Sequence, residues 1–251
     1  MRPKLTFWMI FSLHLFMKLK LTLLYILSFL SLTFFIHEIH DWAHTLVARL
    51  VSGCWGPRFF DGWEFCGDTR IAVGLQVLAI IAGPIVNFIL LWVAWQKMDK
   101  YNSSVQEQSW GVTLTFAALP LNNLLAAVSG GGDLTHAIRL TIRHAERFGH
   151  HFVAIVGLLI MMIICIPPLV RAFICLPWWK GKLSYPIFLI VPGMLDHWLV
   201  KGLLNKWLIK PGMPEEKAYW WVIAWTLFTM TIWLLTRKKI SQLITDEELP
   251  L

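Results

Sequence analysis

One stretch of the chain decides its class of fold: LTLLYILSFLSLTFFIHEIHDWAHTLVARL, which runs from Leu21 to Leu50. Its first half is apolar apart from a few Ser and Thr, and the stretch is longer than the about 20 residues that a helix needs to cross a bilayer. Its second half carries three histidines and two carboxylates. Ionisable groups inside a membrane span are costly, so they are candidates for function.

The composition of the whole chain also predicts a membrane protein. Of the 251 residues, 57% are hydrophobic and only 15% are charged, whereas soluble domains carry about 25% charged residues. Disorder, a collagen-like repeat and a small disulfide scaffold are excluded. The 15 Trp and 16 Phe suit aromatic belts at the two membrane interfaces. The length predicts one domain or at most two.

The net charge of +7 also fits a membrane protein. Lys and Arg lie in short loops beside apolar spans, where they set topology and contact anionic lipid. We therefore expect the lipid bilayer as a partner and no nucleic acid. Cys165 and Cys175 lie in an apolar run and are expected to be buried thiols. Cys54 and Cys66 share one loop and would form a disulfide if that loop faces an oxidising compartment.

The sequence predicts an all-α, polytopic integral membrane protein with about six transmembrane helices, since lipid admits only helices or closed barrels. A strand is expected, if anywhere, within the polar loop from Gly53 to Arg70. Pro167 and Pro168 are expected to kink the fourth span. The expected spans are Leu21 to Leu50, Ile71 to Trp95, Trp110 to Val128, Phe152 to Leu176, Leu183 to Leu208 and Tyr219 to Leu235.

Four segments follow from these spans. Residues 1–20 are expected to be an uncleaved interfacial or short membrane helix, 21–148 a metal-binding membrane core, 149–236 additional transmembrane helices, and 237–251 a polar tail. Leu134 to Phe148 is expected to form one helix with Arg139, Arg143 and Arg147 on one face, either in the membrane interface or solvated. Basic residues near both termini favour cytoplasmic ends, but the topology stays open.

The polar cluster of the first span has the spacing of a metal site. On a helix that turns about 100° per residue, His40 and His44 lie on one face, and His37 shares it. Two histidines four residues apart can bind one metal ion. The pair reads H-D-x-x-H, with Asp41 where zinc proteases carry the Glu that deprotonates the metal-bound water. Glu38 lies about 100° from His37 and is a poor candidate for metal chemistry.

Three stretches resemble the site-2 protease family of intramembrane zinc metallopeptidases. The sequence HDWAHTLVARL, from His40 to Leu50, is similar to the first motif of that family. The sequence AGPIVNF, from Ala82 to Phe88, resembles its A-G-P-x-x-N segment. The stretch from Pro120 to Asp133 resembles N-x-x-P-x-x-x-L-D-G, although its Pro and the Gly after Asp are displaced. The resemblance covers about Leu21 to Leu140.

This resemblance implies a three-helix protease core that binds one zinc ion per chain and cleaves a membrane-embedded substrate helix. His40, His44 and Asp133 would be the zinc ligands, and Asp41 would stand at the position of the general base. Gly83 and Pro84 would let the helices approach closely. Asn87 and Asn122 or Asn123 would lie near the site and would hold either a substrate strand or the active helices.

Asp41 is the main departure from the family pattern. Asp is one methylene shorter than Glu, and a displacement of about 1 Å can cost about 10²-fold in rate. Three outcomes are therefore open. The backbone lies closer to the metal and the enzyme works, a second water relays the proton slowly, or the protein binds metal without cleaving peptides. Asp41 also lies four residues after His37 and would orient that ring in a supporting role.

Two rival functions remain open. One is a catalytically inactive membrane scaffold. The other is a membrane di-iron oxidase or desaturase, which also uses H-D-x-x-H and would bind iron in place of zinc. That class needs an H-x-x-H-H box, and Arg147 stands where the first histidine before His150 and His151 is required. The pair Asp196 and His197, in the fifth span, is expected to make a hydrogen bond between helices.

Overall fold

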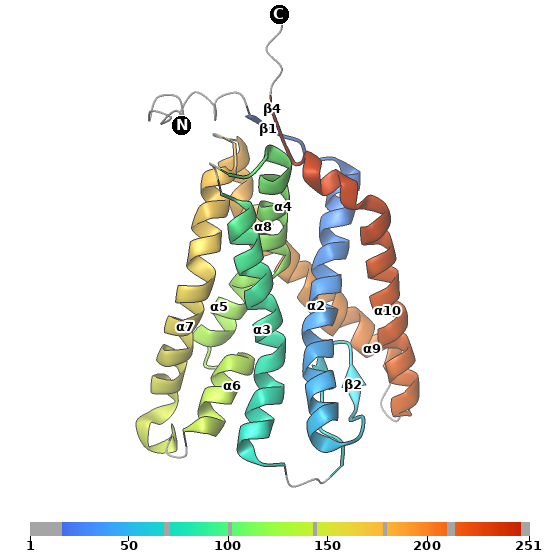
Figure 1. Cartoon of the computed structure of the whole chain (residues 1–251). Coiled ribbons are helices and arrows are strands. Elements are labelled where there is room, and N and C mark those ends of the chain that lie inside the picture. The colour runs from blue at the N-terminus through green and yellow to red at the C-terminus, as the bar shows by residue number, and fades with distance from the viewer. Residues whose placement is uncertain are drawn as a thin grey trace, which may run out of the picture.

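The computed structural model describes residues 17–67, 71–99, 102–142, 145–177, 180–209 and 214–246. Six of its helices are long and apolar enough to cross a membrane, which confirms the predicted all-α class and is consistent with a multi-pass membrane protein. They stand roughly side by side (Figure 1). Many large apolar side chains point outward, where lipid would cover them, among them Leu23, Leu50, Ile163 and Leu235.

The helices have these bounds: α2 Leu23–Ser52, α3 Val73–Lys97, α4 Val105–Ala117, α5 Pro120–Val128, α6 Gly132–Thr141, α7 Ala145–Cys175, α8 Lys180–Asp196, the π-helix η1 His197–Leu204, α9 Asn205–Leu208, α10 Glu215–Thr236 and the 3₁₀-helix η2 Arg237–Gln242. The strands are β1 Met17–Leu19, β2 Arg58–Phe59, β3 Gly62–Trp63 and β4 Ile244–Asp246. The helix α2 packs against α3 and α10.

The first span begins and ends on local capping residues. The Thr22 side chain accepts a hydrogen bond from the Tyr25 backbone N–H at 3.1 Å and caps the start of α2. Gly53 ends the helix at φ 82°, a left-handed conformation that glycine adopts without a steric penalty. Inside the bundle, the Tyr25 hydroxyl and Thr113 Oγ1 lie 3.1 Å apart and link α2 to α4. These contacts fix the height of α2, and hence of its histidines, in the bundle.

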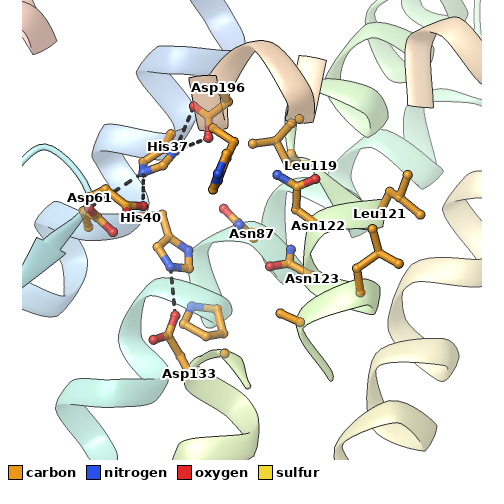
Figure 2. Close-up of a pocket in the computed structure, with 18 of the residues that line it drawn as sticks. His37, His40, Asp61, Asn87, Leu119, Leu121, Asn122, Asn123, Asp133 and Asp196 are labelled. Atoms are coloured by element: carbon orange, nitrogen blue, oxygen red, sulfur yellow. Dashed lines mark hydrogen bonds and ion pairs between the residues drawn. The ribbon is translucent and has the colours of Figure 1, made fainter. Parts of the chain in front are cut away.

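The predicted span from Trp110 to Val128 is interrupted. The helix α4 starts at a capping box made by Ser104 and Glu107 and stops at Ala117, and α5 begins at Pro120. A residue before proline is disfavoured in the helical region, and Leu119 adopts φ 50° and ψ 50° instead. The break redirects the chain so that the first turn of α5 faces the centre of the bundle (Figure 2).

The prediction of a single helix from Leu134 to Phe148 is wrong, because two helices share this stretch. The helix α6 ends at Thr141, and Ile142 is already extended, with φ −87° and ψ 93°. Ala145 begins α7, which continues through Pro167 and Pro168 to Cys175. Arg139 and Arg147 therefore belong to different helices, and Arg143 lies outside the described residues.

The ends of the described chain pair with each other, which the sequence did not predict. The strands β1 and β4 form an antiparallel pair in which Lys18 opposes Thr245, at one end of the bundle (Figure 1). Two expectations are corrected here, because Met17–Leu19 is not part of an N-terminal helix and the C-terminal segment is not simply a polar tail. Its apolar residues Ile240, Leu243 and Ile244 are buried in the main core. Residues 1–16 lie outside the described chain.

The loop between α2 and α3 lies at the opposite end of the bundle. It contains the hairpin of β2 and β3, in which Arg58 opposes Trp63 and Phe59 opposes Gly62. A disulfide joins Cys54 and Cys66 on either side of the hairpin, whereas Cys165 and Cys175 are buried thiols, as expected. The disulfide closes the loop, so the hairpin is held against the end of α2 that carries the histidines.

Candidate metal centre

His40, His44 and Asp133 come together although the aspartate is far from the histidines in sequence. The two Nε2 atoms lie 3.1 Å apart, and Asp133 Oδ2 lies 3.2 Å from His40 Nε2 and 3.3 Å from His44 Nε2. Ligands of a tetrahedral zinc ion lie about 3.3 Å apart, since its bonds to nitrogen and oxygen are about 2.0–2.1 Å long. The donor set and its spacing therefore fit one zinc ion.

The surroundings orient these ligand atoms. His44 Nδ1 donates to the carbonyl oxygen of Ala79 at 2.8 Å, which leaves Nε2 as the nitrogen that points at the site. Partial burial by itself would raise the pKa of Asp133, but hydrogen bonds with His40 and His44 outweigh it and hold that pKa below its ordinary value. Asp133 reaches the site because the glycine-rich turn at the start of α6, with Gly130 and Gly132 at positive φ, places the first turn of α6 beside the histidines of α2.

Gly83 makes the approach of α3 to the site possible. A Cβ at this position would lie 2.7 Å from His40 Nε2 and would also overlap His44 Nε2. Any side chain larger than hydrogen would therefore occupy the space in which the two imidazoles meet. The role that the A-G-P segment was expected to have, close approach of the helices, fits this contact.

The three ligands line a cavity of about 920 Å³ inside the bundle. Figure 2 shows the interior with the His40–Asp133 contact on one side and the His37–Asp196 contact on the other. In this view Asn87, Asn122 and Asn123 lie to the right of both contacts, and all three were predicted to lie near the site. Asn87 is 7% exposed, and among the described residues neither its Oδ1 nor Asn123 Nδ2 has a hydrogen-bond partner.

Asp41 also lines the cavity, but its carboxylate is paired. Arg58 of β2 is fully buried, and its Nη1 lies 3.1 Å from Asp41 Oδ2. The Nη2 of the same arginine donates to Glu38 Oε2 at 2.9 Å. Glu38 thus neutralises a buried arginine and is not one of the three metal-ligating groups, in line with its predicted position off the metal-binding face. Arg58 was missed, because nothing in the loop sequence indicates that its side chain turns inward.

His37 is the centre of a second polar contact group. Its Nδ1 lies 2.9 Å and 2.8 Å from the two carboxylate oxygens of Asp196, at the end of α8. Its Nε2 lies 3.8 Å from Asp41 Oδ2 and 3.7 Å from Asp61 Oδ1. Asp61 pairs in turn with Lys201 at 2.9 Å; burial raises the pKa of Asp61, and this ion pair opposes the rise. The helix contact predicted for Asp196 exists, with His37 as its partner.

Comparison with models of protein families, with curated proteins and with solved structures finds no match to this chain. Within the described part of the chain, one group of three or more His, Cys, Asp or Glu has its ligand atoms within 4.8 Å of one another, and it consists of His40, His44 and Asp133.

Proposed function

We propose that the protein is an intramembrane zinc metalloendopeptidase, which hydrolyses a peptide bond of a membrane-embedded substrate. The observation that carries the proposal is the convergence of His40, His44 and Asp133 on one point at the wall of a cavity inside an apolar helix bundle. Two imidazoles and a carboxylate from the protein leave a fourth zinc position open, as in catalytic zinc sites. Zinc bound there would polarise a carbonyl and lower the pKa of a water.

Residues near the metal site would supply the general base and the groups that bind the substrate. Asp41 follows His40 directly and would accept a proton from the attacking water. The unpartnered Asn87 Oδ1 and Asn123 Nδ2 offer an acceptor and a donor, which complement the N–H and C=O of an extended peptide. The cavity of about 920 Å³ has room for a short unwound segment of a substrate. Unwinding is needed, because a helix has its backbone groups already bonded.

The disulfide suggests which side of the membrane the site serves. Cys54 and Cys66 belong to the loop whose Trp63 stacks on His44, with ring centroids 5.1 Å apart. Disulfides persist in oxidising compartments, so the metal site would open toward the oxidising face and the β1–β4 pair would lie on the cytoplasmic side.

This orientation predicts a labelling pattern. After mild reduction, a membrane-impermeant maleimide added to intact bacteria that express the protein should label Cys54 and Cys66. In an Asn102→Cys variant on the background Cys54→Ser/Cys66→Ser, the new thiol lies at the opposite end, between α3 and α4, and should react only after the cells are permeabilised. Labelling of Asn102→Cys in intact cells would refute this orientation.

The decisive test of peptidase activity uses purified protein in bicelles with a fluorescent transmembrane peptide. Zinc-dependent cleavage is expected. An Asp41→Asn variant should retain zinc and lose about 10²- to 10⁴-fold in rate, which is the range that general bases contribute. Cleavage by Asp41→Asn at the wild-type rate would exclude Asp41 as the base.

A second candidate function is favoured by one contact. The Arg58–Asp41 ion pair at 3.1 Å holds the carboxylate that would act as the base, as expected of a zinc-binding scaffold that does not cleave. A protein that binds zinc tightly but leaves the peptide intact, in the wild type and in Asp41→Asn alike, would support the scaffold.

A further inference from the structure

The contact between His37 and Asp196 has the form of a proton-transfer pair. Both oxygens of Asp196 face His37 Nδ1, at 2.9 Å and 2.8 Å, so the proton on Nδ1 is donated to a carboxylate that is 4% exposed. This leaves Nε2 as the chemically available nitrogen of the ring. Nε2 lies 3.7–3.8 Å from its nearest carboxylates, too far for a hydrogen bond. His37 lines the same cavity as the metal-ligating group.

The charges around His37 favour a ring that carries a proton on both nitrogens. Carboxyl groups lie around it on three elements, namely Asp41 and Glu38 on α2, Asp61 in the β2–β3 turn and Asp196 on α8. The cations in this network are Arg58, paired with Asp41 and Glu38, and Lys201, paired with Asp61. The four carboxyl groups of this network outnumber its two cations, so an imidazolium at His37 has acidic partners on three sides.

We propose that His37 is the proton donor to the leaving nitrogen, with Asp196 as the residue that positions its ring. The inference rests on the proposed function, peptide hydrolysis in this cavity. His37 lies one helical turn before His40. In one bound peptide, the metal-ligating group would therefore lie near the carbonyl carbon and His37 Nε2 near the leaving nitrogen. Two other carboxyl groups of the cavity are engaged elsewhere, because Arg58 holds Asp41 Oδ2 and Asp133 faces both metal-ligating histidines.

In the hydrolysis, the oxygen of the attacking water bonds to the carbonyl carbon and the C–N bond breaks. When the C–N bond breaks, its electron pair stays on nitrogen, and that nitrogen takes the proton from Nε2 and leaves as an amine. His37 is then a neutral imidazole, with Nδ1–H still donated to Asp196. The proton that Asp41 accepts from the attacking water is then released to water in the cavity, and the ring takes a proton back from the same source. Lys201, whose side chain is 50% exposed, connects this region to solvent through Asp61.

A pair of substrates separates proton donation from structural support. An amine cannot leave without a proton, whereas a phenolate can. The probes are a fluorescent transmembrane peptide and an aryl ester of its acyl half, both in bicelles with zinc-loaded protein. Asn at position 37 can still donate an amide N–H to Asp196 but has no proton for the leaving group, so His37→Asn is the informative variant. Exposed His136, on α6 and outside the cavity lining, gives the control His136→Asn.

The expected result is a split between the two substrates. His37→Asn should lose about 10²- to 10³-fold in kcat on the peptide, stay within about threefold of wild type on the aryl ester, and keep its zinc. Asp196→Asn should also lose rate on the peptide but not on the aryl ester, with a smaller loss than His37→Asn. This variant tests the inference if His37→Asn does not fold. His136→Asn should change neither rate.

Two other outcomes would overturn the inference in different ways. Equal losses on peptide and ester, or no loss on the peptide, would remove His37 as the donor and leave the proposed hydrolysis standing. A wild-type protein that retains zinc but cleaves neither substrate would remove the proposed function, and this inference with it.

Discussion

Gly83→Ala is expected to lower zinc affinity about 100-fold or more, at least as much as the loss of an outer-shell partner of a metal ligand. The added Cβ would lie 2.7 Å from His40 Nε2 and overlap His44 Nε2, so both rings must leave the positions in which they converge. Alanine is otherwise the better helix former by about 1 kcal/mol, so the substitution should not unfold α3. Isothermal titration of the metal-free protein with zinc measures the effect.

The same helix provides a matched control. A Cβ at Gly74 would meet nothing within 4 Å, so Gly74→Ala should bind zinc like the wild type. Equal zinc affinity of the Gly83→Ala and Gly74→Ala variants would mean that α3 does not approach the two imidazoles as closely as the structure has it.

Arg58→Met is expected to destabilise the fold by about 3–5 kcal/mol, the usual cost of removing one partner from a buried ion pair. Arg58 is fully buried and contacts two carboxylates, of which Glu38 is also fully buried and Asp41 nearly so. Without the guanidinium, both negative charges lack their partner inside the bundle. Unfolding in mixed micelles with increasing dodecyl sulfate, followed by circular dichroism, gives the free energy.

Lys201→Met is the comparison, because it breaks a pair whose lysine is 50% exposed and should cost only about 0.2–1 kcal/mol. Combining Arg58→Met with Glu38→Met should cost less than Arg58→Met alone, since one uncompensated charge is removed with its partner. A double variant less stable than the Arg58→Met variant would show that the two residues do not act as a pair.

The spans and the histidine pair could be predicted because both depend on local sequence. A run of apolar residues sets the length of α2, and the spacing of His40 and His44 sets their common face. Asp133 was predicted only through the family resemblance, and the glycines before α6 explain how it reaches the site.

The long-range partners could not be predicted. Asp196 could be singled out because an ionisable group inside a span is costly. Its partner could not be predicted, because His37 lies 159 residues away in the sequence. Arg58 lies in a polar loop in which an outward side chain is the ordinary expectation, and its burial depends on how the hairpin folds against α2. The pairing of β1 with β4 could not be predicted either, because strands of three residues are too short to show an alternation of apolar and polar residues.

The most direct test of the account is the zinc content of the gently purified protein, measured beside a His40→Ala/His44→Ala variant. We predict about one zinc per wild-type chain, as the three-residue ligand set requires, and none in the variant. No bound metal in the wild type after zinc is offered, or about two irons per chain, would contradict the central claim that His40, His44 and Asp133 form a zinc site.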